Sequence, residues 1–110
     1  MKKVALTFVT AILVALCGHA LAQGAPKGNA EAAKSKISLC IGCHALVGYK
    51  TAFPAVYHVP MIGGQSADYL TKALQAYRAG DRNHPSMRAV AQSLSDQDIA
   101  DLAAYYSMAK

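Results

Sequence analysis

Two cysteines and a histidine stand close together in the chain, in the run Cys40-Ile41-Gly42-Cys43-His44. On a helical turn, residues three positions apart lie on the same side, with their Cβ atoms roughly 5–6 Å apart. Two thiols placed in this way can add to the vinyl groups along one edge of a porphyrin, and the next histidine can bind the iron axially. Because C-x-x-C-H is the spacing of covalent haem attachment, the sequence predicts one haem c held by Cys40, Cys43 and His44.

Two other kinds of site use cysteines at this spacing. A redox-active thiol pair normally lies in a βαβ unit, whereas no segment of this chain alternates convincingly with the period of a strand. A zinc site would need further ligands such as His58 and His84, and these show no paired metal spacing. Both remain alternatives to the haem.

The second axial ligand decides how the iron behaves. A methionine thioether favours ferrous iron and raises the reduction potential, which is the pattern of electron-transfer haems. The candidates are Met61, Met87 and Met108. Met87 is preferred because it lies in a predicted polar loop, where a methionine has no evident role in a core. His58 and His84 are its rivals, and either would give a bis-histidine iron of lower potential.

The first 22 residues have the pattern of a secretory signal peptide. Lys2 and Lys3 form its positive start, residues 4–16 its apolar stretch, and Ala20-Leu21-Ala22 its small-x-small cleavage site. Cleavage there leaves residues 23–110 as one exported domain, and the loss of two lysines lowers the formal charge from +5 to +3. We therefore expect a periplasmic protein.

Two other interpretations of this leader are an uncleaved membrane anchor and a lipid attached to Cys17. The apolar stretch is shorter than the about 20 residues that span a bilayer. Leu16 is larger than the residue that usually precedes a lipid-bearing cysteine. We therefore predict a mature protein without a lipid anchor or a stable membrane span.

The composition is that of a small folded domain. Of 110 residues, 54% are hydrophobic and 15% are charged, which excludes intrinsic disorder. The basic residues are scattered and not clustered, which argues against nucleic acid as a partner. A domain of this size buries a limited core and needs a disulfide, a metal or a cofactor for support.

Three to five short helices and no strands are predicted around the C-x-x-C-H run, which makes the fold class all-α. They cover residues 30–40 after the N-cap Asn29, 66–79 between the N-cap Ser66 and the stop at Gly80, 88–93, and a stretch from the capping box at Ser95 to near the C-terminus. Residues 23–28 are predicted to be a mobile lead-in. The loop 45–65 is apolar and contains several Gly and Pro residues, so it should wrap around something.

Together these segments resemble a class I c-type cytochrome of the small monohaem kind. The resemblance is carried by the C-x-x-C-H run, Val59-Pro60-Met61-Ile62-Gly63-Gly64-Gln65, Tyr69-Leu70, Arg78-Ala79-Gly80-Asp81-Arg82, Met87 and residues 94–106. It implies a cytochrome c fold, in which the terminal helices cross near the haem edge and loops enclose the ring. It also implies that Met87 is the axial ligand and that the Pro60 carbonyl accepts a hydrogen bond from the axial histidine.

The sequence departs from the family pattern in two places. Ala33 stands where family members often have glycine, at the close crossing of the terminal helices. The loop from Ala45 to Val59 is longer and more aromatic than in many relatives. This loop could shield the haem or dock a partner, and the sequence does not decide between the two.

The resemblance implies an electron-transfer protein and not an enzyme, namely a periplasmic one-electron carrier with a single His/Met haem. Its partners would be a quinol–cytochrome reductase, a periplasmic dehydrogenase and a terminal oxidase. One alternative is a fixed cytochrome subunit of a periplasmic oxidoreductase. Another is a haem enzyme or gas sensor with a labile sixth ligand.

Overall fold

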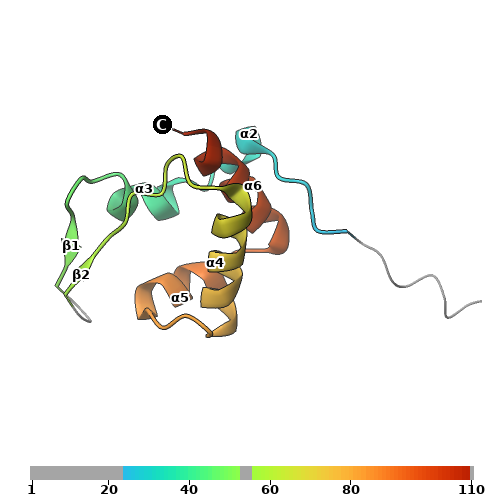
Figure 1. Ribbon diagram of the computed structural model, residues 1–110. Coiled ribbons are helices and arrows are strands. Elements are labelled where there is room, and N and C mark those ends of the chain that lie inside the picture. Colours follow the sequence, from blue (N-terminus) through green and yellow to red (C-terminus); the bar gives the residue numbers. More distant parts are fainter. Residues whose placement is uncertain (1–23, 53–55, 110) are drawn as a thin grey trace, which may run out of the picture.

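The computed structural model describes residues 24–52 and 56–109, so the predicted leader, residues 1–22, lies outside the described part of the chain. The elements in this part are α2 (Ala30–Ala33), α3 (Ser38–His44), β1 (Lys50–Thr51), β2 (Tyr57–His58), α4 (Ala67–Ala79), α5 (Pro85–Gln92) and α6 (Asp96–Met108) (Figure 1). The predicted all-α class is confirmed. None of the described helices has the length and apolar character to cross a membrane.

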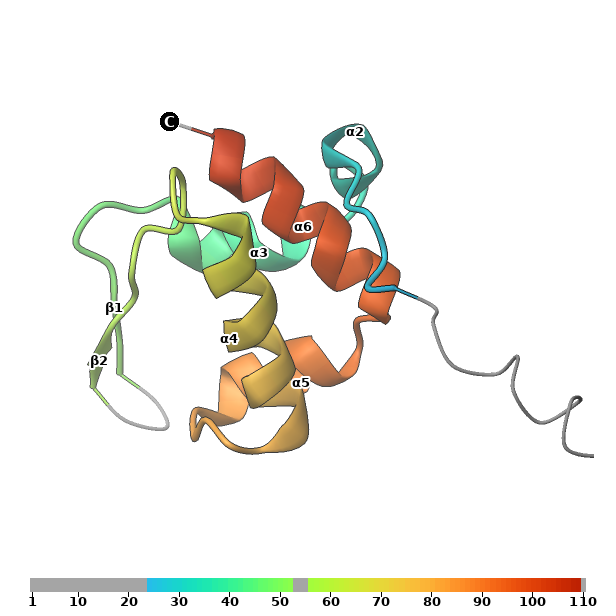
Figure 2. The ribbon, with the colours of Figure 1, turned by 45° about the vertical axis from the view of Figure 1, so that its right-hand side comes forward.

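The C-terminal helix α6 is the centre of the packing. It packs against both α2 and α4, and α5 packs on α4 (Figures 1 and 2). The apolar face predicted for α6 is buried, and Ile99 and Leu102 are its largest side chains with almost no exposure. The core consists of Ala33, Leu70, Leu94, Ile99, Leu102, Ala103 and Tyr106.

Side-chain caps set the ends of the two longest helices at the positions predicted from the sequence. The Ser66 hydroxyl accepts a hydrogen bond from the N–H of Tyr69. The Ser95 hydroxyl accepts from the N–H of Asp98, whose carboxylate accepts from the N–H of Ser95 in return. Gly80 ends α4 with a φ of 94°, a left-handed conformation that glycine adopts without strain.

The prediction of one helix over residues 30–40 is wrong, because the chain forms two short helices joined by a tight turn. The N–H groups of Lys34 and Lys36 bond to carbonyls three residues back, which is tighter than an α-helix. The Ser35 hydroxyl donates to the Ala32 carbonyl, and local bonds of this kind compete with regular helix. The turn places Lys36 against α6.

A buried carboxylate on α6 anchors the start of the described chain. Asp101 is 2% exposed and accepts hydrogen bonds from the N–H of Asn29 and from the Gln97 amide, each at 2.8 Å. Lys36 lies 3.6 Å from Asp101 and forms a closer ion pair with Asp98. Burial opposes ionisation of Asp101, but the bonds from Asn29 and Gln97 outweigh it, so its pKa lies below the usual range.

Two residues of the predicted mobile lead-in, Lys27 and Gly28, lie in contact with α6, while Gln23 is outside the described residues. A side-chain amide of α6 donates to the Lys27 carbonyl at 3.0 Å. Gly28 lies against the α6 backbone, where an added Cβ would stand 2.2 Å from the Ala100 carbonyl oxygen. The terminal segments therefore approach closely at Gly28, in addition to the crossing at the fully buried Ala33.

The loop over residues 45–65 contains a short antiparallel hairpin, although no strand is expected from the sequence. Lys50 lies opposite His58, and Thr51 lies opposite Tyr57. Each strand is two residues long, too short for an alternating pattern to be visible in the sequence. The hairpin extends from the level of α3 toward that of α5 (Figures 1 and 2).

Helix α5 begins earlier than predicted, which moves Met87 from a loop onto a helix. The helix starts at Pro85 instead of Arg88, and Met87 lies in its first turn. Proline suits the first helical position because its φ is preset and its missing N–H is not needed there. His84 supplies the N-cap. Histidine is not among the preferred N-caps, so this start is not evident from the sequence.

Replacement of Asp98 by Asn tests the ion pair between the turn and α6. The Lys36 side chain, followed by the Ser95 N–H, holds the pKa of Asp98 at about 2, below its ordinary 3.8. Such a carboxylate stabilises the fold above its unfolded-state pKa, and this stabilisation is lost as pH falls from about 4 to about 2. Asp98→Asn should therefore unfold at lower urea than the parent at about pH 6, and at the same urea near pH 2.

The amide introduced by Asp98→Asn keeps an oxygen for the Ser95 N–H, so the variant removes the charge and leaves the cap. Asp68→Asn, which removes an exposed ion pair within α4, is the control and should change stability less. A difference between parent and Asp98→Asn that stays constant down to about pH 2 would contradict the assignment.

Candidate functional site

One pocket brings all five predicted site residues together: Cys40, Cys43, His44, Pro60 and Met87. We call it the central pocket; residues of α3, the hairpin, α4, α5 and α6 line it. Figure 2 shows how these elements are arranged. The rest of its lining is mostly apolar or aromatic and includes Leu39, Tyr57, Val59, Ile62, Tyr69, Leu70, Ala73, Leu74, Tyr77, Val90, Leu102, Ala103 and Tyr106. The apolar stripe predicted on α4 and part of the apolar loop thus face the same space.

The two cysteines enter the central pocket from α3 at different depths. Cys40 is partly buried, Cys43 is exposed, and neither is in a disulfide. Burial raises the pKa of the Cys40 thiol, and the Tyr106 hydroxyl beside it acts in the opposite direction. Burial also raises the pKa of Tyr106, whose hydroxyl has no conventional hydrogen-bond partner among the described residues. Cys40 therefore lies against α6, and Cys43 lies nearer to solvent.

A backbone carbonyl holds the His44 ring. The Nδ1 atom of His44 lies 2.6 Å from the carbonyl oxygen of Pro60. Because a carbonyl can only accept, Nδ1 must carry the proton and donate, which leaves the lone pair of Nε2 free for a metal. An outer partner of this kind fixes both the tautomer and the orientation of a ligating histidine.

Of the three candidate methionines, Met87 alone lines the central pocket. Met61 is 54% exposed and Met108 is 67% exposed, and both lie outside the lining. His58 is exposed on β2 and is also outside the lining. Met87 therefore lies in the central pocket, whereas Met61, Met108 and His58 lie outside its lining.

His84 lines the central pocket too, but its ring is engaged at the start of α5. Its Nδ1 accepts the N–H of Met87 at 3.4 Å. A neutral imidazole that accepts through Nδ1 carries its proton on Nε2, so neither nitrogen offers a free lone pair to a metal. The Tyr57 ring packs edge-on against it, with ring centroids 5.3 Å apart. His84 is better placed to hold Met87 than to replace it.

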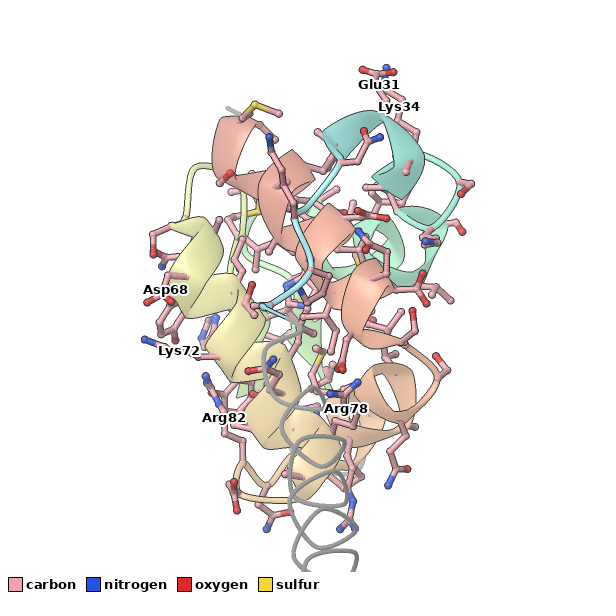
Figure 3. All side chains as sticks on the ribbon, turned by 90° about the vertical axis from the view of Figure 1, so that its right-hand side faces the viewer. Glu31, Lys34, Asp68, Lys72, Arg78 and Arg82 are labelled. Atoms are coloured by element: carbon pink, nitrogen blue, oxygen red, sulfur yellow. The ribbon has the colours of Figure 1, made fainter. Side chains whose placement is uncertain are left out.

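A charged side chain that was not among the predicted site residues also lines the central pocket. The guanidinium of Arg82, labelled in Figure 3, belongs to the loop after α4. It lies 4.7 Å from the centre of the Tyr77 ring and donates to the Tyr69 hydroxyl at 3.4 Å. The turn at Gly80 places it there, since the Arg82 N–H folds back to the Ala76 carbonyl. The sequence signal for the position of Arg82 is the helix-ending Gly80, two residues before it.

Most other charges form ion pairs that hold the fold. Figure 3 shows Glu31 beside Lys34 on α2 and Asp68 beside Lys72 on α4, and each pair is 2.8 Å apart. Arg78 donates to a backbone carbonyl just before α6 and so ties α4 to that helix. None of these five residues lines the central pocket.

The donor set and the walls of the central pocket fit a haem. Two thiols, an imidazole with a free nitrogen and a thioether line a largely apolar space, which suits a flat apolar ring around an iron. Among residues 24–52 and 56–109, no three His, Cys, Asp or Glu side chains are grouped as metal ligands. The alternative of a zinc site has no ligand set in this part of the chain.

Comparison with known proteins likewise indicates a haem-binding domain. The sequence model of the cytochrome c family matches residues 30–108. Cytochrome c-554(548) of Halomonas halodenitrificans is 47% identical over 83 residues, which are 73% of this chain and 95% of that protein. Cytochrome c4 of Stutzerimonas stutzeri is 36% identical over 92 residues, which are 76% of this chain and 42% of that protein.

A third relative from Stutzerimonas stutzeri is named thiosulfate dehydrogenase electron acceptor and is 36% identical over 73 residues, 62% of this chain and 31% of that protein. The chain thus spans nearly the whole of the first relative but less than half of the other two. The family match includes the C-x-x-C-H run, Pro60, Met87 and all of α6. With this match and the donor set of the central pocket, the chain belongs to the cytochrome c family, whose members carry covalently bound haem and transfer electrons.

Proposed function

We propose that this chain is a periplasmic one-electron carrier with a single haem c. Cys40 and Cys43 attach the ring through thioethers, and His44 and Met87 bind the iron. The observation that carries the proposal is the meeting of His44 and Met87 in one apolar pocket, with Nδ1 of His44 engaged by Pro60. When bound, the haem supplies an iron that changes oxidation state by one electron.

The residues of the chain favour electron transfer. His44 and Met87 would both hold the iron, which would leave no free site on it for oxygen or peroxide. The apolar walls of the central pocket would limit the access of water to the ring. Nδ1 of His84, the histidine beside Met87, is occupied as a helix cap and is not free to accept a proton as a base. These features favour a carrier over a haem enzyme or a gas sensor.

The surface around the C-x-x-C-H run suits brief contact with an acidic protein. Residues 39–67 contain no Asp or Glu, while Lys50 and His58 are exposed on the hairpin. Large apolar side chains outside the lining of the central pocket are exposed in the same segment: Ile41, Leu46, Val47, Tyr49, Val56 and Met61. Charge of one sign beside an apolar patch speeds association with an oppositely charged partner. A reductase, a dehydrogenase or a terminal oxidase would therefore approach from this side.

A fixed cytochrome subunit of a periplasmic oxidoreductase is the second candidate, and the exposed apolar side chains of residues 39–61 favour it. By its name, one relative serves a dehydrogenase as electron acceptor. Elution of the native protein alone, as a monomer, would favour the shuttle. Co-purification with one equivalent of a catalytic subunit would favour the fixed subunit.

The axial ligation is tested by the optical spectrum of the ferric, haem-loaded protein. The parent should show the far-red sulfur-to-iron band, and Met87→Ala should lose it and have a lower reduction potential. Met61→Ala removes an exposed methionine outside the central pocket and should keep the band. A parent without the band would mean that Met87 is not on the iron, and a bis-histidine or open site would replace this proposal.

The docking side is tested with two small redox reagents of opposite charge. Lys50→Glu should slow electron transfer to anionic ferricyanide and speed transfer to a cationic cobalt complex, each severalfold at low salt. Both changes should vanish at high ionic strength, because salt screens exposed charges. Lys34→Glu, at the C-cap of α2 and paired with Glu31, is the matched control. Equal effects of the two variants would show that net charge alone matters and would remove the hairpin from the docking side.

A further inference from the structure

The hairpin touches the helix that carries Met87. Tyr57, on β2, lies edge-on against the ring of His84, with centroids 5.3 Å apart and ring planes at 65°. His84 is the N-cap of α5, and its Nδ1 accepts the N–H of Met87 at 3.4 Å. All three side chains line the central pocket. A residue of the long aromatic loop is therefore connected through one intermediate to the proposed axial methionine.

We propose that Tyr57 and His84 form a clamp that holds the first turn of α5 and thereby keeps the Met87 thioether in place as the axial ligand. Both are positioning residues, because they act through Met87 and not on the iron. The inference rests on the proposed function, since it takes Met87 as the ligand. It adds a role for the hairpin, which is to set how readily that ligand is displaced.

The start of α5 depends on its cap. The first N–H groups of a helix have no partner within the helix, and the N–H of Met87 is one of them. Helix α5 is eight residues long, well below the length at which a helix persists by itself. Loss of the bond to His84 would leave the first turn held only by the contacts of its later residues. Met87 lies in that turn, so its side chain would lose its fixed position.

A histidine cap holds only while its ring stays in one rotamer. Rotation about the bonds of the side chain would turn Nδ1 away from the N–H of Met87. The edge of Tyr57 against the ring restrains this rotation. Tyr57 is itself placed by the hairpin, where it lies opposite Thr51, whose hydroxyl donates to the Tyr57 carbonyl at 3.4 Å.

The clamp joins the two sides of the proposed iron site. Tyr57 belongs to the segment between His44 and Pro60, on the side of the axial histidine. His84 and Met87 belong to the segment after α4. Figures 1 and 2 show the hairpin reaching from the level of α3 to that of α5, which is the path that the contact requires.

The test measures how readily imidazole displaces Met87 in the ferric, haem-loaded protein, followed by loss of the far-red band. Tyr57→Ala and His84→Ala should each raise the affinity for imidazole about fivefold, as expected for the loss of one aromatic contact or one cap. Tyr57→Phe keeps the ring edge and should match the parent. Val56→Ala, at a neighbouring hairpin position that is 76% exposed and outside the lining, should also match it.

A double-variant comparison separates the clamp from a general loosening of the protein. His84→Asn keeps a capping oxygen but removes the ring that Tyr57 contacts. In that background Tyr57→Ala should have no further effect on imidazole affinity, because the two residues act in series. Tyr57→Leu, which keeps apolar bulk without an aromatic edge, gives the same comparison if Tyr57→Ala does not take up haem.

The outcomes separate the two proposals. A parent without the far-red band would overturn the ligation by Met87, and the clamp with it. A parent with the band, together with Tyr57 variants whose imidazole affinity stays within about twofold of the parent, would overturn the clamp alone. An equal effect of Tyr57→Ala in the parent and in the His84→Asn background would also overturn it, since the effect would then bypass His84.

Discussion

The hydrogen bond from Nδ1 of His44 to the carbonyl of Pro60 connects the end of α3 to the loop that leads into α4. The same loop is tied to the core, because the N–H of Gly64 donates to the carbonyl of Tyr106 on α6 at 2.8 Å. The Tyr106 side chain in turn lies beside Cys40. His44, Cys40 and the loop that contains Pro60 are therefore all connected by these contacts to α6. The orientation of the proposed axial ligand is thus determined by the most buried element of the fold.

Contacts elsewhere on α6 hold that helix in position. Asp101 binds the chain at Asn29, and Gly28 lies directly on the helix backbone. Lys36 adds an ion pair from the turn before α3. The segment that enters the domain and the segment that carries the thiols are thus fastened to the same helix from two directions. A shift of α6 would disturb both, which makes its position strongly constrained.

Local signals account for what the sequence could predict. Ser66, Gly80 and Ser95 act on their own neighbours, so the ends of α4 and the start of α6 can be read without knowledge of the fold. The same holds for the C-x-x-C-H run, whose chemistry depends on spacing alone. The crossing of the terminal helices, by contrast, was predicted only from the resemblance to the cytochrome c family.

Contacts between distant segments account for what the sequence could not predict. The early start of α5 depends on a histidine cap whose ring is restrained by the hairpin. The split between α2 and α3 accompanies the reach of Lys36 to α6. In both cases the deciding partner is in another element.

The hairpin shows how one loop can serve the pocket and the surface at once. Neighbouring residues of a strand point to opposite faces, and residues opposite each other in register point to the same face. Thr51 and Tyr57 are such a pair, and both line the central pocket. Lys50 and His58 are the adjacent pair, and both are exposed. Shielding the haem and docking a partner are therefore not competing explanations of the long loop, because the geometry of a strand assigns them to different faces.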